Sequence, residues 1–186
     1  GVKSGIPISR AWKLCPEAVY LPVNYELYKK VSSEIMCILR EYADKFEQWG
    51  IDEAFLDVTS RVNSYEEAEV LAHQIKRKIL ENEGLTCSVG IGPNKLVAKI
   101  ASDFQKPDGL TVVKEEDVEK FLAPLRVRKL LWVGRKTEQK LKSIGINTIG
   151  DLANYDPTVL TENFGVMGTQ LHLMAHGIDR SEVEER

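Results

Sequence analysis

The sequence has 186 residues, of which 43% are hydrophobic and 28% charged, and its formal net charge is −3. This fits one generous globular domain or two small ones and excludes a membrane-spanning protein, because no stretch approaches the roughly 18 apolar residues that a bilayer requires. The small negative charge argues against strong overall attraction to nucleic acid. Since the start of the sequence also lacks the pattern of a signal peptide, we expect a cytoplasmic protein with no membrane partner.

Three segments in the first two thirds of the sequence show the apolar spacing of amphipathic helices. Apolar residues recur at steps of three and four from about Tyr25 to Tyr42, which predicts the first helix. A second helix is predicted from about Ser64 to Glu83, where Ser64 and Glu67 have the spacing of a capping box. The third is predicted from about Asn94 to Phe104.

Short extended segments alternate with these helices. They are Val19 to Pro22, Lys45 to Ile51, Ala54 to Thr59, Thr86 to Ile91 and Leu110 to Val113. Strands with helices between them predict an α/β or α+β domain that ends near Val113, and Glu115 to Leu125 is predicted to close it as a further helix.

The sequence pattern changes after Arg126. Short helical segments separated by glycines follow, and no strand pattern is present. We therefore predict a boundary at about residues 114 to 128 and a small all-helical unit behind it. This unit begins with seven basic residues and one acid between Arg126 and Ile146, which could bind phosphates or form an ordinary solvated helical face.

Two adjacent acids, Asp52 and Glu53, lie in the predicted tight connection between two strands. Their like charges repel each other unless a cation offsets them. A pair of carboxylates suits Mg²⁺, which completes its coordination with water and substrate phosphates. On spacing alone, a solvated turn is the more ordinary interpretation.

Several motifs resemble one known family. Residues 50–57, Gly-Ile-Asp-Glu-Ala-Phe-Leu-Asp, are similar to a signature of Y-family, lesion-bypass DNA polymerases of the DNA polymerase IV type. Residues 1–7, 87–102 and 106–110 resemble further segments of that family, in the same order. The resemblance runs essentially from end to end.

The resemblance implies an α+β fold with three parts. These are the end of a fingers domain at residues 1–17, a ferredoxin-like palm with an antiparallel sheet and packed helices at 18–115, and a helical thumb at 126–180. It implies template-directed transfer of a nucleotide from an incoming dNTP to the primer end of primer-template DNA, with two Mg²⁺ ions. Asp52 and Glu53 would be catalytic metal ligands, and Lys106 would bind the triphosphate.

The predicted helical unit resembles a helix-hairpin-helix around Gly134, Arg135 and Lys136, which would hold the DNA backbone without reading bases. Trp132 departs from this motif, because it stands where the first hairpin glycine is usual. Trp12, Trp49 and Trp132 could each stack on bases, although isolated aromatic residues more often pack in a core or at its rim.

The family's first catalytic aspartate and its aromatic gate against ribonucleotides precede the segment that matches Gly1. Its separate DNA-binding domain, through which a sliding clamp could recruit the parent protein, follows the matched region. We therefore expect a fragment that is itself inactive. Two other classes remain open: a nucleotide cyclase-like palm enzyme and a noncatalytic DNA-binding module.

Overall fold

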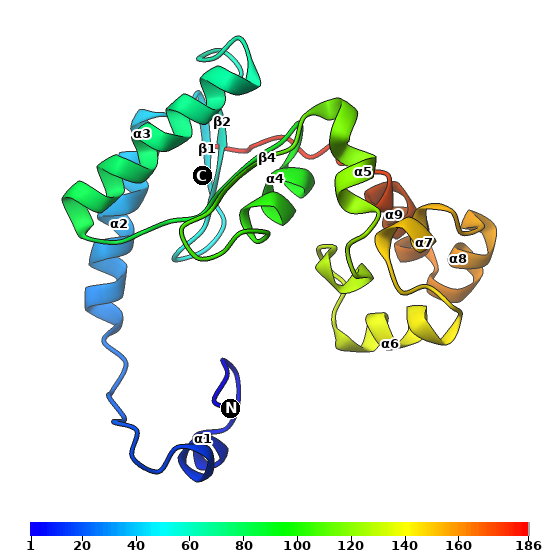
Figure 1. The fold of residues 1–186 in the computed structure, drawn as a ribbon, viewed down its shortest axis with the longest axis horizontal. Helices are drawn as coiled ribbons and strands as arrows, with labels where there is room; N and C mark the ends of the chain where they lie inside the picture. The colour runs from blue at the N-terminus through cyan, green and yellow to red at the C-terminus, as the bar shows by residue number, and fades with distance from the viewer. Residues whose placement is uncertain (186) are drawn as a thin grey trace.

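The computed structural model describes residues 1–185, and Figure 1 shows them as two bodies and an N-terminal arm. The arm contains α1 (Ile8–Leu14). The first body comprises α2 (Tyr25–Glu41), β1 (Lys45–Gln48), β2 (Ala54–Asp57), α3 (Tyr65–Glu83), β3 (Val89–Ile91), α4 (Lys95–Ser102) and β4 (Leu110–Val112). The second comprises the 3₁₀ helix η2 (Val127–Lys129), α6 (Arg135–Ser143), α7 (Ile149–Ala153), α8 (Pro157–Phe164) and α9 (Val166–Ala175). Between them lie the 3₁₀ helix η1 (Glu115–Asp117) and α5 (Val118–Leu122).

Helices α2, α3 and α4 confirm the three amphipathic patterns to within about two residues at each end. Each begins at a side chain that caps a free backbone N–H: Asn24, Ser64 and Asn94 accept hydrogen bonds from residues three positions later. Only one of the two hydrogen bonds of the predicted capping box at α3 is present. Ser64 accepts from the Glu67 N–H, but the Glu67 carboxylate accepts from the backbone of Asn63 instead of Ser64.

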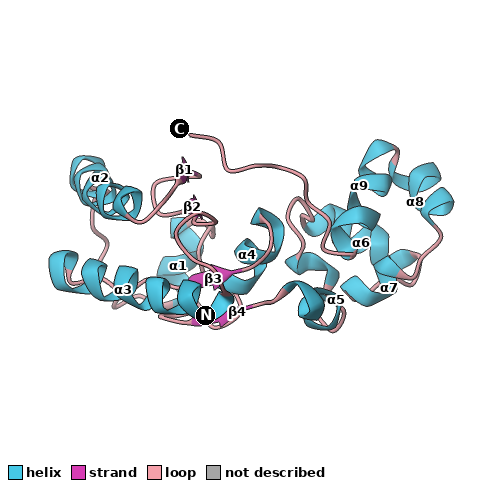
Figure 2. Cartoon of the chain, turned by 90° about the horizontal axis from the view of Figure 1, so that it is seen from above, coloured by secondary structure: helices cyan, strands magenta, loops and turns pink. Residues whose placement is uncertain are grey.

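The α+β class is confirmed, although the strands are less uniform than the predicted antiparallel sheet. Strands β1 and β2 pair antiparallel, with Phe46 opposite Leu56, whereas β3 and β4 pair parallel, with Gly90 opposite Thr111. The parallel pairing follows from the connection, because α4 returns the chain to the starting end of β3. Figure 2 shows the two pairs of strands, with α2 and α3 at one end of the molecule and α6 to α9 at the other.

In the first quarter of the chain one prediction was wrong and one helix was missed. Residues Val19 to Pro22 form no strand; Val19 and Leu21 are about four-fifths exposed, so nothing covers their apolar side chains. The helix α1 was not predicted, since only Ala11 in it is buried and it carries little amphipathic signal.

One buried cluster connects the two bodies. It begins on α4, includes Val113 and Leu122, and continues through Leu141 and Leu171 of the second body. Helices α8 and α9 of the second body pack closely at Gly168. A Cβ at this position would lie only 2.2 Å from the Leu160 carbonyl oxygen. Gly168 therefore serves the packing of α9 against α8.

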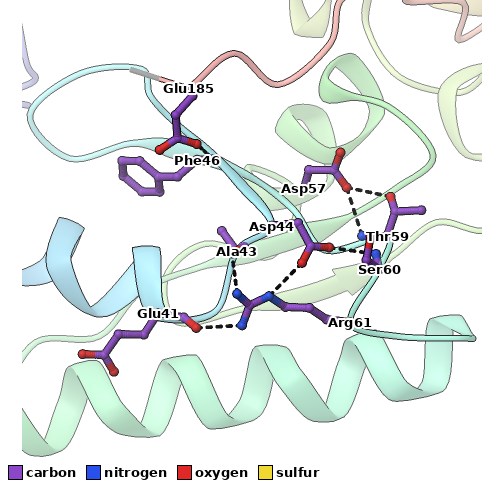
Figure 3. A network of polar contacts seen from close by, with 9 residues as sticks. All are labelled: Glu41, Ala43, Asp44, Phe46, Asp57, Thr59, Ser60, Arg61 and Glu185. Carbon is purple, nitrogen blue, oxygen red and sulfur yellow. Dashed lines mark hydrogen bonds and ion pairs between the residues drawn. The ribbon is translucent and has the colours of Figure 1, made fainter.

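An arginine fixes the far end of the β1–β2 hairpin, as Figure 3 shows. The Arg61 guanidinium donates to the carbonyl oxygens of Glu41 and Ala43 and to the Asp44 carboxylate, at 2.7, 2.6 and 3.0 Å. Asp44 also accepts from the Ser60 N–H at 2.7 Å. The end of α2 and the start of β1 are thereby tied to the turn that follows β2.

After α9 the chain returns to the first body along β1. The Asn94 amide donates to the Gly177 carbonyl at 2.7 Å, and Asp179 accepts from the Leu96 N–H at 3.1 Å. Further along, Glu185 accepts from the Phe46 N–H at 2.9 Å, which is visible at the top of Figure 3. Residues 177–185 are therefore a second link between the two bodies, and we call them the return segment.

Within residues 1–185, no helix combines the length and the apolar character that crossing a membrane requires.

The contact between β3 and α4 generates a stability prediction. A Cβ on Gly90 would lie 2.0 Å from the Ala98 carbonyl oxygen and 2.3 Å from the Ser102 nitrogen, so backbone would have to shift. Gly90→Ala should lower the free energy of unfolding by about 3 kcal/mol in urea denaturation. Gly50→Ala is the matched control, because its Cβ would meet only Asp52 at 3.9 Å. It should change the free energy of unfolding by less than about 0.5 kcal/mol. Equal effects of the two substitutions would contradict this packing.

Candidate active site

The turn that carries Asp52 and Glu53 is held from two sides. The backbone N–H groups of Trp49 and Gly50 donate to the Glu53 carbonyl oxygen at 2.9 and 3.2 Å, which closes the turn. The buried Ser32 hydroxyl on α2 donates to the Ile51 carbonyl. The prediction that the two acids lie in a tight connection between paired strands is confirmed.

The two carboxylates have different surroundings. Asp52 is exposed, and among the described residues no side chain or backbone group forms a hydrogen bond or ion pair with its carboxylate. Glu53 is half-buried and accepts a hydrogen bond from the Lys99 ammonium on α4 at 2.9 Å. Lys99 thus offsets one of two neighbouring negative charges and leaves the other available to a ligand.

Lys99 belongs to a chain of alternating charges. It also donates to Asp103 at 2.9 Å, and Asp103 forms a second ion pair with Lys106. Burial alone would raise the pKa of Asp103, but the hydrogen bonds from Lys106 and Lys99 outweigh it and hold that pKa below its ordinary value. Burial alone would lower the pKa of Lys99, but its bonds to Glu53 and Asp103 raise it. Asp103 and Lys99 are therefore both charged at neutral pH.

Lys99 on α4 and Asp103 at its C-cap are four residues apart and form the i, i+4 ion pair that this spacing allows. Sequence reasoning missed the further contact from Lys99 to Glu53, which joins residues 46 positions apart. It also missed Lys76 on α3, which donates to the Asp108 carbonyl at 3.0 Å and holds the Pro-Asp-Gly turn beside Lys106. No local pattern marks a contact across 32 residues.

Three predicted site residues meet at one cavity. Asp52, Glu53 and Lys106 all line a cavity of about 530 Å³ between β2 and β3. Its inner wall is apolar and is formed by α2 and α3, through residues such as Leu39, Leu71 and Ile75. The structure thus places carboxylates and an ammonium at the polar mouth of a largely apolar slot.

The donor set fits a hard divalent cation. Two carboxylates supply only oxygen ligands and leave most coordination positions to water and to substrate phosphates, as Mg²⁺ prefers. Within residues 1–185, no group of three or more His, Cys, Asp or Glu side chains forms a site that could hold a metal by itself. Asp52 and Glu53 would hold such an ion only together with ligands from outside this group.

The predicted DNA-contact residues lie elsewhere, at the start of α6. Gly134 is the N-cap of α6, is exposed, and has no side-chain cap. Arg135 and Lys136 follow it in the first turn and are exposed. Because the N–H groups of a first helical turn carry partial positive charge, this end favours anions. These three residues do not line the cavity at Asp52.

The comparisons with known proteins agree with this arrangement. The family described as impB/mucB/samB matches residues 1–103, and a family described as the thumb domain of DNA polymerase-iota matches residues 129–179. The first match covers more than half of the chain, which therefore belongs to the impB/mucB/samB family. The predicted resemblance to Y-family polymerases of the polymerase IV type is confirmed.

Among its relatives, DNA polymerase IV 2 of Methanosarcina mazei is 52% identical over 186 residues, which are all of this chain and 50% of that protein. DNA polymerase IV of Nitrosopumilus maritimus is 48% identical over 191 residues, covering all of this chain and 52% of that protein. The chain thus spans about half the length of the curated relatives it matches.

Solved structures show the same fold. DinB from Sulfolobus solfataricus superposes with a TM-score of 0.93 at 36% identity, covering 100% of this chain and 55% of that one. An insertion ternary complex of Dbh DNA polymerase superposes with a TM-score of 0.92 at 36% identity, covering 99% of this chain and 54% of that one.

The charge chain generates a pH prediction. Since the pKa of Asp103 is lowered by folding, its ion pairs stabilise the fold above the unfolded pKa of about 4, and this contribution is lost as pH falls through the folded pKa. Asp103→Asn should therefore destabilise the chain at pH 6 in urea denaturation, and its difference from the wild type should shrink toward pH 3. A difference that stays constant over this range would contradict the assigned pairing.

Proposed function

We propose that this chain supplies most of the palm, at residues 18–115, and the thumb, at 126–180, of a template-directed DNA polymerase for lesion bypass. Residues 1–17 would be the end of its fingers. The observation that carries the proposal is the meeting of Asp52, Glu53 and Lys106 at one cavity, within a fold shared with DNA polymerases along the whole chain. The thumb-domain match over residues 129–179 favours a polymerase over a nucleotide cyclase.

In this proposal Asp52 and Glu53 bind the two Mg²⁺ ions of nucleotidyl transfer. Bound there, the ions would lower the pKa of the primer 3′-hydroxyl and neutralise the leaving pyrophosphate. The exposed Asp52 carboxylate is free to act as a shared ligand, whereas Glu53 is positioned by Lys99. A ligand that takes over Glu53 would leave Lys99 with Asp103 as its partner.

Lys106 would bind the triphosphate of the incoming dNTP. Its ammonium is about half-exposed and pairs with Asp103, which positions it at the cavity mouth without burying it. Phosphate oxygens would either replace Asp103 or bind the Lys106 ammonium beside it, because an ammonium group has three N–H donors.

The apolar slot between β2 and β3 supports a further part of the proposal. In the described part of the chain each of these strands has one paired edge, toward β1 and β4 respectively, and both line the slot. We propose that an extended segment of the whole protein fills it and brings the additional metal carboxylate that the family resemblance implies. This would place three acids at the mouth of the slot.

The start of α6 would hold the DNA backbone. Gly134 leaves space in front of the first helical turn, since a Cβ there would meet nothing within 4 Å, and Arg135 and Lys136 add positive charge. Such contacts bind phosphates of any sequence, as a polymerase that moves along its template requires. Recruitment of the whole protein by a sliding clamp remains part of this proposal.

The test is primer extension by a chimera in which this chain replaces the matching half of the Methanosarcina mazei relative. Asp52→Asn should reduce magnesium-dependent extension at least about 100-fold, because removal of a metal ligand costs several kcal/mol of transition-state stabilisation. Binding of primer-template DNA should change less than about threefold. Glu162→Gln, an exposed acid on α8, is the control and should extend as the unsubstituted chimera does.

Extension by Asp52→Asn at the rate of the control would refute the metal assignment. An unsubstituted chimera that folds and binds DNA but does not extend a primer would refute the proposed activity of this chain.

A further inference from the structure

Trp132 adopts a backbone conformation that tryptophan ordinarily avoids. Its φ is +66°, and it shares positive φ with only one other non-glycine among the described residues, Asp108. The turn favours this conformation, because Leu130 at its start and Val133 at its end are buried in the core and a Val133 N–H to Leu130 carbonyl bond closes it. The left-handed region is strained for an L-residue but not for glycine, which has no Cβ.

Burial of the Trp132 side chain does little to offset this backbone strain. The Trp132 indole is 67% exposed, and its one ring contact is an edge-to-face contact with Trp49, with ring centroids 6.2 Å apart. Trp49 is 42% exposed and in turn meets Phe55 edge-to-face at 5.3 Å. A strained and exposed tryptophan contributes little to folding, and such residues concentrate where a protein binds something.

The position of this pair relates it to both parts of the proposed site. Trp49 directly precedes the Asp52 turn and donates its N–H to Glu53, whereas Trp132 lies two residues before Gly134. The contact between the two indoles therefore joins the hairpin that carries the carboxylates to the turn that precedes α6. We call Trp49 and Trp132 the indole pair.

Exposed cations lie on both sides of Trp132 in the chain: Lys129 precedes it, and Arg135 and Lys136 follow it. Four acids, Glu47, Asp179, Glu182 and Glu184, line the cavity beside the indole pair. Among them, Glu47 pairs with Lys95 at 2.6 Å, Glu182 pairs with Lys45 at 3.1 Å, and Asp179 accepts from the Leu96 N–H at 3.1 Å. Exposed indoles with several cations close by in the chain suit the sugar–phosphate strand of a nucleic acid.

We propose that the indole pair packs against the deoxyribose faces of the bound DNA strand, between the phosphate held at α6 and the strand end at Asp52. This rests on the proposed function and adds to it a contact that carries no charge and reads no base. It also gives Trp132 a role at the position where the hairpin motif usually has glycine.

The test is fluorescence anisotropy of the 186-residue chain with a 5′-labelled primer-template duplex. Trp132→Gly removes the ring and relieves the backbone, so the melting temperature should stay or rise while the Kd increases about tenfold. Trp132→Asn, which also tolerates positive φ, should give the same loss. Trp132→Phe keeps both the ring and the strain and should bind within about threefold of the wild type.

The matched control is Trp12→Ala, which removes an indole of similar exposure, 57%, from α1 and should leave the Kd unchanged. Because the Trp132 variants lose no charge, the slope of log Kd against log salt should stay as in the wild type. Arg135→Ala with Lys136→Ala should reduce that slope by about two.

If Trp132→Gly and Trp132→Asn bind the duplex as the wild type does while the double basic variant binds more weakly, the indole-pair contact is overturned. The proposed contact of α6 with the DNA backbone would then still be supported. Failure of the unsubstituted chain to bind the duplex, or wild-type binding by the double basic variant, would overturn the proposed grip itself. A change of salt slope in Trp132→Gly would also count against the uncharged contact.

Discussion

The structure depends on two ion pairs that run from α4 to the β1–β2 hairpin. Lys95 and Lys99 are four residues apart and therefore lie on one face of the helix, from which they reach Glu47 and Glu53 at 2.6 and 2.9 Å. The opposite face of α4 belongs to the buried cluster that continues into the second body. One short helix thus fixes the hairpin acids relative to the helices of the second body.

The Glu47–Lys95 pair is the more deeply buried of the two ion pairs. The side chains are only 4% and 11% exposed, so both charges have lost most of their water and depend on each other. The same carboxylate accepts the Glu184 N–H at 3.0 Å, and the same ammonium donates to the Glu182 carbonyl at 3.2 Å. β1, α4 and the return segment therefore meet at one buried pair, which limits how far the second body can move from the carboxylates.

The sequence predicted the parts of this arrangement that local spacing determines. Periodic apolar residues located α2, α3 and α4, and the paired strands located the Asp52 turn. Contacts across long separations could not be predicted: Lys99 to Glu53, Lys76 to Asp108, and the parallel pairing of β3 with β4 have no signal within one segment. Trp132 shows the same limit, because its departure from a glycine pattern was visible but its exposure depends on the burial of Leu130 and Val133 in the same turn.

The central claim is that α4 holds the hairpin through buried ion pairs, and a double-mutant cycle on Glu47 and Lys95 tests it most directly. In urea denaturation, Glu47→Leu and Lys95→Met should each lower the free energy of unfolding by about 3 kcal/mol, because each leaves a buried charge without its partner. The double variant should be more stable than either single variant. If it instead loses the sum of the two single effects, the pair is not coupled and the account is contradicted.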